Sequence, residues 1–363
     1  MEGGSEQSAP AAEEDRRARV RKRLHHGLFV GGALLVLVYA GLVMSAGGAN
    51  LIRQLSSLNP KLLILPLLAT FLSYLSMSLS YEGIARAAGS VMRSSDMLRI
   101  TFVANTANYV FPSGGLSGFA LRLIMFTRKG ISTGRAVLIS FTQTLLTNLT
   151  LMIFIVYGLT HLMLTQKLAR GSLIITLAVI IALVIFLGGA LYLVYHRRGR
   201  TRALGVGRRM VDWTLAKTGH LERYGKRVDR LFVHIDDGME FFASKPTAMI
   251  APLLWILLDW VLTVGVLYGA FYSIGRPVDY SQVAVGFSVG IVLTIISFVP
   301  AGAGILETSM AAAFASMGIP LAESVLPIFI FRVCFYVIPA LLSLLFARSA
   351  FTEVDTAVAE DLL

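Results

Sequence analysis

Four ionisable residues lie inside long apolar stretches of the chain, where a charge is costly and tends to face the interior of a protein. They are Arg122, Asp259, Glu307 and Arg332. An arginine offers a planar fork of donors that matches a phosphate or a carboxylate. Two kinds of chemistry follow: an arginine holds the phosphate of a substrate, or it pairs structurally with an acid of this chain.

The sequence leaves both uses open for each of these residues. Arg332 is the strongest candidate for a buried cation, and it either binds a substrate phosphate or pairs with Glu307. Glu307 itself either balances that charge or binds a cationic part of a head group. Arg122 also suits a side chain that reaches the membrane surface, and Asp259 lies beside Trp260 in a segment with interfacial aromatic residues.

Three uncharged polar residues complete the predicted substrate-binding set. Tyr336 follows Arg332 by one helical turn, and Asn105 and Asn108 bring amides into an apolar segment. Hydrogen bonds between helices are the commoner use of such amides in a membrane. We therefore predict contact with a ligand or with a neighbouring helix at both asparagines.

Two breaks rich in proline and glycine interrupt apolar segments close to these residues. The breaking residues are Pro112, Ser113, Gly114 and Gly115 in the first, and Pro300, Gly302 and Gly304 in the second. Proline removes a backbone donor and glycine weakens a helix. Backbone groups freed at membrane depth are tolerated only inside protein or beside a wet cavity. The breaks therefore predict a cavity.

Membrane-spanning helices must position these residues. The 363-residue chain is 56% apolar and 15% charged, with a mean hydropathy of +0.73, whereas a soluble domain is about 45–50% apolar and about 25% charged. Disordered, disulfide-rich and ordinary cytosolic classes are thereby excluded. A span needs about 20 apolar residues, and six stretches qualify: Leu28–Ala46, Leu62–Ser80, Ala136–Leu159, Leu173–Tyr195, Met249–Tyr272 and Ala322–Phe346.

Lysine and arginine in short loops orient these spans, because such loops stay in the cytoplasm. The N-terminal tail 1–27 and the loop 196–247 are basic. Within the loop, Arg197–Arg230 contains eleven Lys or Arg and three acids, so it carries +8 of the net charge of +11. Both segments, and the acidic tail 349–363, are predicted to be cytoplasmic. The broken regions 100–127 and 281–317 then enter the membrane from opposite sides.

The predicted fold is therefore an all-α polytopic membrane protein with about six full spans and two re-entrant helical hairpins. The hairpins lie in two membrane halves, 28–195 and 248–348, that form an inverted repeat. Interrupted helices in inverted repeats are typical of transporters with a substrate site near the bilayer midplane.

The loop between the halves contains an amphipathic pattern that predicts a helix. Its apolar positions recur at helical spacing from Val228 to Phe242. Such a helix suits either a solvated basic loop or a contact between residues 197–230 and anionic lipid.

Other classes of protein find no support in the sequence. Neither a phosphate-loop motif nor an H-E-x-x-H motif is present, and the longest loop is too short for a catalytic domain. We expect no enzymatic activity, no cofactor, no metal and no nucleic-acid partner. Membrane phospholipids are the expected partners, and assembly into a homo-oligomer stays open.

The motifs around the breaks resemble the lysylphosphatidylglycerol synthase transmembrane family, which is flippase-like. The resemblance extends roughly from Leu28 to Arg348. Its motifs are Asn108–Gly115 followed by Arg122, Pro300–Glu307, and Phe331-Arg332-Val333 with Tyr336 and Pro339. The carboxylate common after the first glycine is absent, because Leu116 and Ser117 stand there. The family's aminoacyl-transferase domain is missing, so synthesis of a lysyl lipid is not expected.

The resemblance and the buried charges together lead to one leading hypothesis and two alternatives. The leading hypothesis is a multi-pass protein of the bacterial inner membrane that moves a phosphate-bearing lipid between the leaflets. The first alternative is a scaffold that docks enzymes of envelope lipid or glycan synthesis without transport. The second is a transporter of a polyprenyl-phosphate sugar or of a soluble anion.

Overall fold

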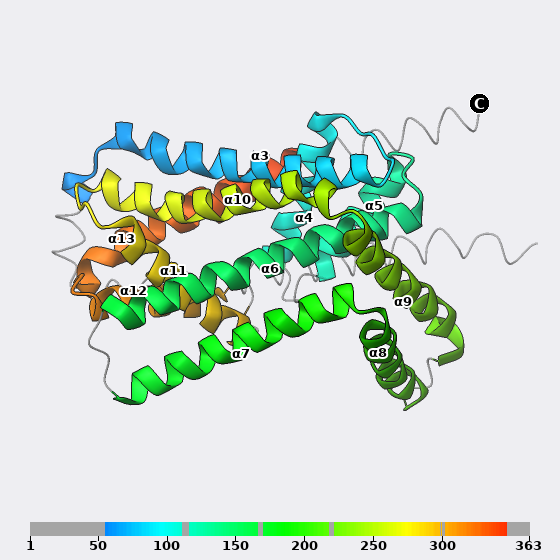
Figure 1. Ribbon diagram of the computed structural model, residues 1–363. Coiled ribbons are helices and arrows are strands. Elements are labelled where there is room, and N and C mark those ends of the chain that lie inside the picture. Colours follow the sequence, from blue (N-terminus) through cyan, green and yellow to red (C-terminus); the bar gives the residue numbers. More distant parts are fainter. Residues whose placement is uncertain are drawn as a thin grey trace, which may run out of the picture.

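The computed structural model describes residues 55–110, 116–165, 170–217, 221–297, 299 and 302–346, and these ranges contain helices and no strand. Several predictions fall outside the described residues: the span Leu28–Ala46, the tails 1–27 and 349–363, Pro112–Gly115 and Pro300. The described chain forms an all-α, multi-pass membrane bundle, as predicted (Figure 1).

The helices differ in length because proline and glycine divide the apolar segments. Those of the first half are α3 (Ile64–Ala87), which follows a 3-10 turn at Pro60–Leu63, α4 (Ser94–Val110), α5 (Leu116–Arg128), α6 (Thr133–Thr165) and α7 (Arg170–Tyr195). Those that follow are α8 (Arg197–Lys217), α9 (Leu221–Ser244), α10 (Pro246–Ser273), α11 (Tyr280–Ser297), α12 (Ile305–Ser316) and α13 (Leu321–Arg332). A π-helical turn at Val333–Val337 continues α13 into a span that ends at Phe346.

Six helices of the described ranges are long and apolar enough to cross a membrane. They are Pro60–Ala87, Thr133–Thr165, Leu173–Tyr195, Pro246–Ser273, Tyr280–Ser297 and Leu321–Phe346. Five of them match spans predicted from the sequence. The sixth, α11, was expected to be part of a re-entrant region, and its 18 residues are long enough to span by themselves.

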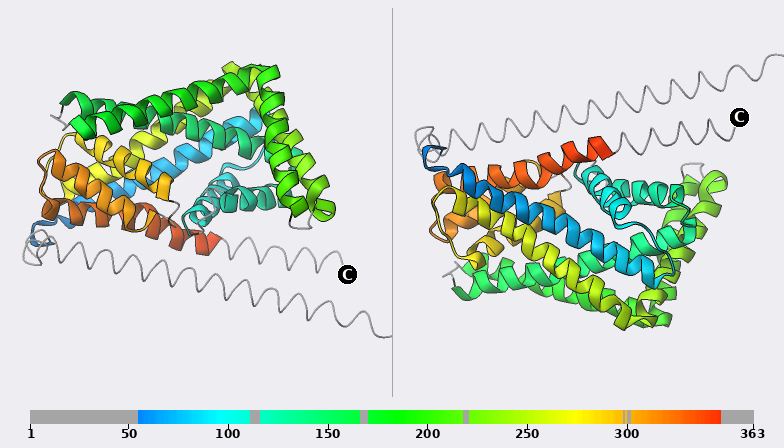
Figure 2. Two further views of the ribbon diagram at one scale, coloured as in Figure 1. Left: turned by 90° about the horizontal axis from the view of Figure 1, so that it is seen from below. Right: turned by 90° about the horizontal axis from the view of Figure 1, so that it is seen from above.

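Two helical hairpins point into the bundle from its opposite ends. The helices α4 and α5 pack against each other, and so do α11 and α12. Figure 1 shows α4 and α5 at the end where α3 finishes and α6 begins, while α11 and α12 start from the end where α10 finishes and α13 begins. Figure 2 shows from two further sides that the two hairpins start from opposite ends of the bundle. This arrangement matches the inverted placement of the two breaks.

The helices α3 and α10 pack against each other through two reciprocal close contacts. A Cβ atom on Gly83 of α3 would lie 3.0 Å from Pro252 Cγ of α10, and one on Gly269 of α10 would lie 3.1 Å from Pro66 Cδ of α3. Each proline thus packs on a glycine of the other helix, and each glycine follows its own helix's proline by 17 residues. A two-fold operation that exchanges α3 and α10 relates the two contacts.

Buried apolar side chains of the described residues form two main clusters, and both include residues of α3 and α10. One lies mostly among α3 to α6, and the other mostly among α10 to α13. Trp260 of α10 packs against both clusters. The region around Trp260 is therefore the junction between the two halves.

The basic segment after α7 folds into the two helices α8 and α9, which cross the end of the bundle (Figure 1). The apolar face that predicted an amphipathic helix belongs to α9 and packs on protein: Phe242 is buried, and a Cβ atom on Gly238 would meet Phe141 of α6. Arg200 of α8 is buried and donates to Asp236 (2.5 Å) and Glu240 (2.8 Å) of α9. Protein contacts therefore account for most of this amphipathic pattern.

Candidate functional site

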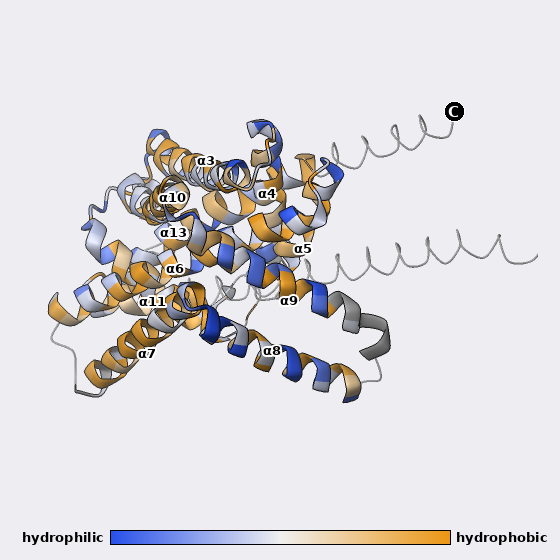
Figure 3. Cartoon of the chain, turned by 45° about the vertical axis from the view of Figure 1, so that its right-hand side comes forward, coloured by the Kyte–Doolittle hydropathy of each residue, from blue (hydrophilic) through white to orange (hydrophobic). Residues whose placement is uncertain are grey.

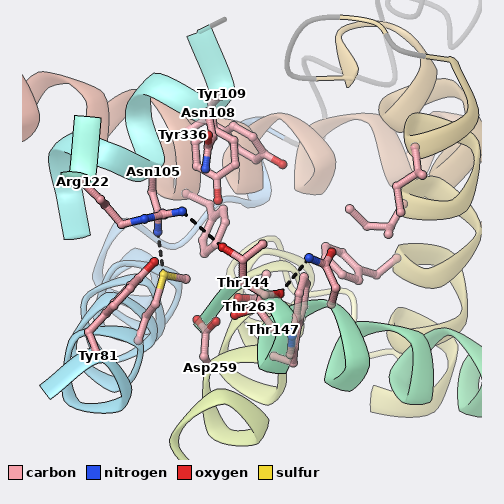
Figure 4. A pocket seen from close by; sticks show the side chains of 17 residues that line it. Tyr81, Asn105, Asn108, Tyr109, Arg122, Thr144, Thr147, Asp259, Thr263 and Tyr336 are labelled. Atoms are coloured by element: carbon pink, nitrogen blue, oxygen red, sulfur yellow. Dashed lines mark hydrogen bonds between the residues drawn. The ribbon is translucent and has the colours of Figure 1, made fainter. Parts of the chain in front are cut away.

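A cavity of about 380 Å³ lies between the two halves (Figure 4). Helices α3, α4, α5 and α6 of the first half line it together with α10, α11 and the π-helical turn of the second. Its polar lining residues are Tyr81, Asn105, Asn108, Tyr109, Arg122, Thr144, Thr147, Asn148, Asp259, Thr263 and Tyr336. Neither Gly302 nor Gly304 of the second break is among its lining residues, so the prediction that the breaks form a cavity stays a prediction.

Arg122 places a buried cation in the cavity wall. Its Nη2 donates to Thr144 Oγ1 at 3.4 Å, and its guanidinium lies 5.4 Å from the centre of the Tyr81 ring. In the described part of the chain, Nε of Arg122 has no hydrogen-bond acceptor and no carboxylate lies within 4.0 Å of the side chain. A buried cation without a carboxylate partner favours the binding of an anion from outside the chain.

The contact between α4 and α5 positions Arg122. The backbone N–H of Gly118 donates to Asn108 Oδ1 at 2.7 Å, so the Asn108 amide ties the two helices together. A Cβ atom on Gly118 would lie 2.4 Å from the carbonyl oxygen of Ala104. Arg122 lies one turn beyond Gly118 on the same face of α5. Asn108 therefore supports the site as well as lining it.

We expect Gly118→Ala to lower the free energy of unfolding by about 1–3 kcal/mol, because the added methyl group forces α4 and α5 apart. Gly188→Ala is the matched control, since a Cβ atom there has no neighbour within 4 Å. Detergent unfolding followed by tryptophan fluorescence measures both. Equal stability of the two variants would contradict the close contact at Gly118.

Asp259 brings a buried acid to the same cavity from α10. Its Oδ1 accepts a hydrogen bond from Ser73 Oγ of α3 at 2.5 Å, and that hydroxyl lies 3.3 Å from Thr263 Oγ1. No described Lys, Arg or His lies within 4.0 Å of the carboxylate. Figure 4 shows Arg122 and Asp259 on different sides of the cavity. The site therefore presents a cation and an acid that do not neutralise each other.

Asn105 and Tyr336 also line the cavity, and their predicted contact with a ligand stays a prediction. Asn105 Nδ2 donates to Met77 Sδ at 2.7 Å. The ring of Tyr336 lies 4.5 Å from that of Tyr109, which is also part of the lining. The two aromatic rings give one side of the cavity an apolar surface.

Arg332 and Glu307 form a buried ion pair outside the cavity lining. Arg332 Nε donates to Glu307 Oε1 at 2.5 Å, and Nη2 donates to the carbonyl of Gly302 at 3.2 Å. The backbone N–H of Gly304 donates to Glu307 Oε2 at 2.8 Å. Gly304 has a φ of +85°, which favours glycine. The pair thus connects α13 to Gly302 and Gly304 and caps the start of α12.

The sequence left two roles open for Arg332 and Glu307: binding a substrate, or pairing with each other. The observed geometry matches the second role. The Arg332 guanidinium lies 4.4 Å from the centre of the Tyr336 ring, and Tyr336 in turn lines the cavity. The pair therefore reaches the cavity through Tyr336. Direct binding of a substrate by Arg332 or Glu307 stays a prediction.

Sequence reasoning missed several lining residues that carry no charge. Thr144 and Thr147 of α6 lie one turn apart, next to Asn148, and form a polar stripe on an otherwise apolar helix. This spacing in the sequence is a signal that could have identified them. Trp260 also lines the cavity, and its Nε1 has no hydrogen-bond acceptor in the described ranges.

The described side chains offer no obvious metal site, since they contain no group of three or more His, Cys, Asp or Glu residues placed to hold an ion. The polar groups of the cavity are hydroxyls, amides, one indole N–H, one guanidinium and one carboxylate. This set suits a ligand that is bound through charge and hydrogen bonds.

The comparison with known families agrees with the motifs at the two breaks. No curated protein matches the chain significantly. The sequence pattern of the family described as "Lysylphosphatidylglycerol synthase TM region" matches residues 27–343. That range contains every residue that lines the cavity and both helical hairpins. The chain therefore belongs to the lysylphosphatidylglycerol synthase transmembrane family.

Proposed function

We propose that this protein moves a phosphate-bearing lipid between the leaflets of the bacterial inner membrane, with the head group in the cavity. The observation that carries the proposal is Arg122, a buried guanidinium in the cavity wall with no carboxylate partner among the described residues. A phosphate accepts two parallel hydrogen bonds from such a group. The substrate would supply the charge that the chain leaves uncompensated.

The shape of the cavity supports a lipid as the substrate. Two of its lining residues, Asn148 of α6 and Ile295 of α11, are exposed at the surface of the bundle, Ile295 by 54%. The cavity therefore reaches that surface, and acyl chains can stay outside while the head group enters. Its volume of about 380 Å³ lies within the range of about 300–1,000 Å³ that is common for small-molecule sites.

The charge distribution supports an orientation in which α8 and α9 face the cytoplasm. These two helices carry 11 of the chain's 32 lysine and arginine residues. Basic loops stay on the cytoplasmic side during insertion. The hairpin of α4 and α5, which starts from the same end, would then open toward the cytoplasm.

The transport itself is tested in proteoliposomes with head-group-labelled fluorescent phospholipids. We expect wild-type protein to speed up exchange between the leaflets at least tenfold over protein-free liposomes, measured by chemical quenching of the outer leaflet. A labelled diacylglycerol glycolipid without phosphate is the control lipid, and it should not be moved. Equal movement of both lipids, or none of either, would reject the proposal.

Asp259 predicts a preference among phosphate-bearing lipids. An acid across the cavity from Arg122 attracts an amine on the same head group. We expect Asp259→Asn to slow exchange of a zwitterionic, amine-bearing lipid several-fold more than exchange of an anionic lipid. Competition between unlabelled phosphatidylethanolamine and phosphatidylglycerol for transport of one labelled lipid measures this preference.

Asp279→Asn is the matched control for that experiment. Asp279 is exposed in the connection before α11 and does not line the cavity, so the same chemical change should leave the preference unaltered. If Asp259→Asn changes the transport of both lipids equally, Asp259 supports the fold through Ser73 and does not recognise the head group.

A further inference from the structure

The helix α8 presents an apolar stripe that the described protein does not cover. Val206 is 56% exposed, and Met210 and Trp213 are each 66% exposed. These residues recur at intervals of four and three, so they share one face of the helix. The opposite face packs on α9, where Gly207 lies against Phe232 and Arg200 is buried. An exposed tryptophan within such a stripe indicates a surface that contacts an apolar environment.

Cations flank the stripe without acidic partners. Arg202, Arg209 and Lys217 are exposed, and no carboxylate lies within 4.0 Å of them in the part of the chain that the structure describes. Lys217 Nζ lies 5.2 Å from the centre of the Trp213 ring.

The acidic residue of α8, Asp212, lies on another side of the helix from the stripe. Asp212 pairs at 3.5 Å with Arg208, which also pairs with Asp229 of α9 at 2.9 Å. The exposed side of α8 is therefore apolar in the middle and basic at its edges. Figure 3 shows hydrophobic and hydrophilic residues alternating along α8.

The position of Gly199 shows which way this stripe faces. A Cβ atom on Gly199 would lie 2.7 Å from the ring of Tyr192, which belongs to the membrane span α7. Val206, Met210 and Trp213 follow Gly199 by 7, 11 and 14 residues, and these intervals return to the same helix face. The stripe therefore points back toward the side on which α7 runs through the membrane.

The direction of α8 places Val206, Met210 and Trp213 at a similar depth relative to the bilayer surface. Figures 1 and 2 show α8 crossing the end of the bundle at a steep angle to α7 and the other spans. His196 alone separates the two helices. Tyr192 and Tyr195 at the end of α7 are exposed aromatic residues of the type found at the surface of a bilayer. The axis of α8 therefore runs close to the plane of that surface.

We propose that α8 is an interfacial helix that binds the anionic phospholipid leaflet beside α7. Val206, Met210 and Trp213 lie in the boundary between head groups and acyl chains, and Arg202, Arg209 and Lys217 contact lipid phosphates. This lipid contact differs from the cavity and from the α9 face that the sequence pattern emphasised. It does not depend on the transport of a lipid.

Tryptophan fluorescence of the full chain in nanodiscs tests the proposal. The chain has three tryptophans, so the signal of Trp213 is the difference between wild type and Trp213→Phe. In nanodiscs of brominated phosphatidylglycerol, we expect bromine to quench this difference signal at least twofold. Iodide in the water should quench it weakly.

A tryptophan on α9 provides a matched control. Val233 is 57% exposed, and by helical spacing it lies opposite Gly238, which faces α6. In the Trp213→Phe background, we expect Val233→Trp to give a signal that iodide quenches and brominated lipid does not. Quenching of Trp213 in the same way as this control would overturn the proposal and leave an acidic soluble protein as the occupant of the stripe.

The basic edges are tested separately from the apolar stripe. We expect the triple variant Arg202→Gln, Arg209→Gln, Lys217→Gln to lose a several-fold preference for brominated phosphatidylglycerol over brominated phosphatidylcholine. Quenching by the zwitterionic lipid should persist, because the apolar stripe is intact. An unchanged preference for the anionic lipid would contradict the role of these three cations.

Discussion

Replacing Arg122 with glutamine is expected to slow lipid exchange in proteoliposomes by about 10- to 100-fold. Hydrogen bonds to a charged group contribute about 1.5–3 kcal/mol, and about 1.4 kcal/mol corresponds to a factor of ten. Glutamine keeps a polar side chain at the Thr144 contact and removes the charge that a phosphate needs. The loss should therefore appear in exchange of phosphate-bearing lipids at unchanged protein stability.

Two further variants make the Arg122 experiment specific. Arg135→Gln removes the same charge from an exposed position near the start of α6, outside the cavity, and should exchange lipid at the wild-type rate. Arg122→Lys keeps the charge without the planar fork of donors and should give an intermediate rate. A wild-type rate for Arg122→Gln, in protein that unfolds normally, would remove Arg122 from the substrate site.

Much of the bundle could be predicted because the signals are local in the sequence. Apolar length identifies a span, and a cluster of proline and glycine identifies a break, without knowledge of the neighbouring helices. Five of the six candidate spans in the described ranges were found in this way. Arg122 and Asp259 were also found, because an ionisable residue in an apolar segment is unusual by itself.

The roles of the charged residues could not be predicted, because they depend on partners far away in the sequence. Arg332 and Glu307 meet because α13 returns beside the second break, whereas Arg122 is left without a carboxylate in the described chain. Similarly, helical spacing identified the apolar face of α9 without showing that α6 and α8 cover it. Periodicity describes a face and leaves open what packs on it.

One long-range feature is nevertheless visible in the sequence. The motif Pro-Leu-Leu begins at Pro66 and again at Pro252, and a glycine follows each proline by 17 residues. In the fold these residues form the reciprocal contacts between α3 and α10. Ser73 and Asp259 occupy equivalent positions, seven residues after each proline, and bond to each other. The internal repeat thus places the Asp259 carboxylate at the contact between α3 and α10.

Replacing Glu307 with leucine is expected to lower the free energy of unfolding by about 3–5 kcal/mol, because it removes the carboxylate from a buried guanidinium. The backbone N–H of Gly304 also loses its acceptor at the start of α12. Loss of lipid exchange in this variant would follow from the destabilised contact between α12 and α13. Unfolding in detergent, measured before any transport assay, distinguishes this effect from a loss of substrate binding.

The double variant Glu307→Leu, Arg332→Leu distinguishes an ion pair from two independent contributions. Removing both charges leaves no uncompensated ion, so we expect the double variant to be less destabilised than the sum of the two single variants. The half-exposed pair of Arg276 and Glu323, at 2.7 Å, is the matched control. Its single variants should cost about 0–1 kcal/mol, because water screens the charges. Additive effects at Arg332 and Glu307 would contradict the coupling of the pair. A Glu307→Leu protein that is stable but does not exchange lipid would instead indicate that Glu307 binds the substrate.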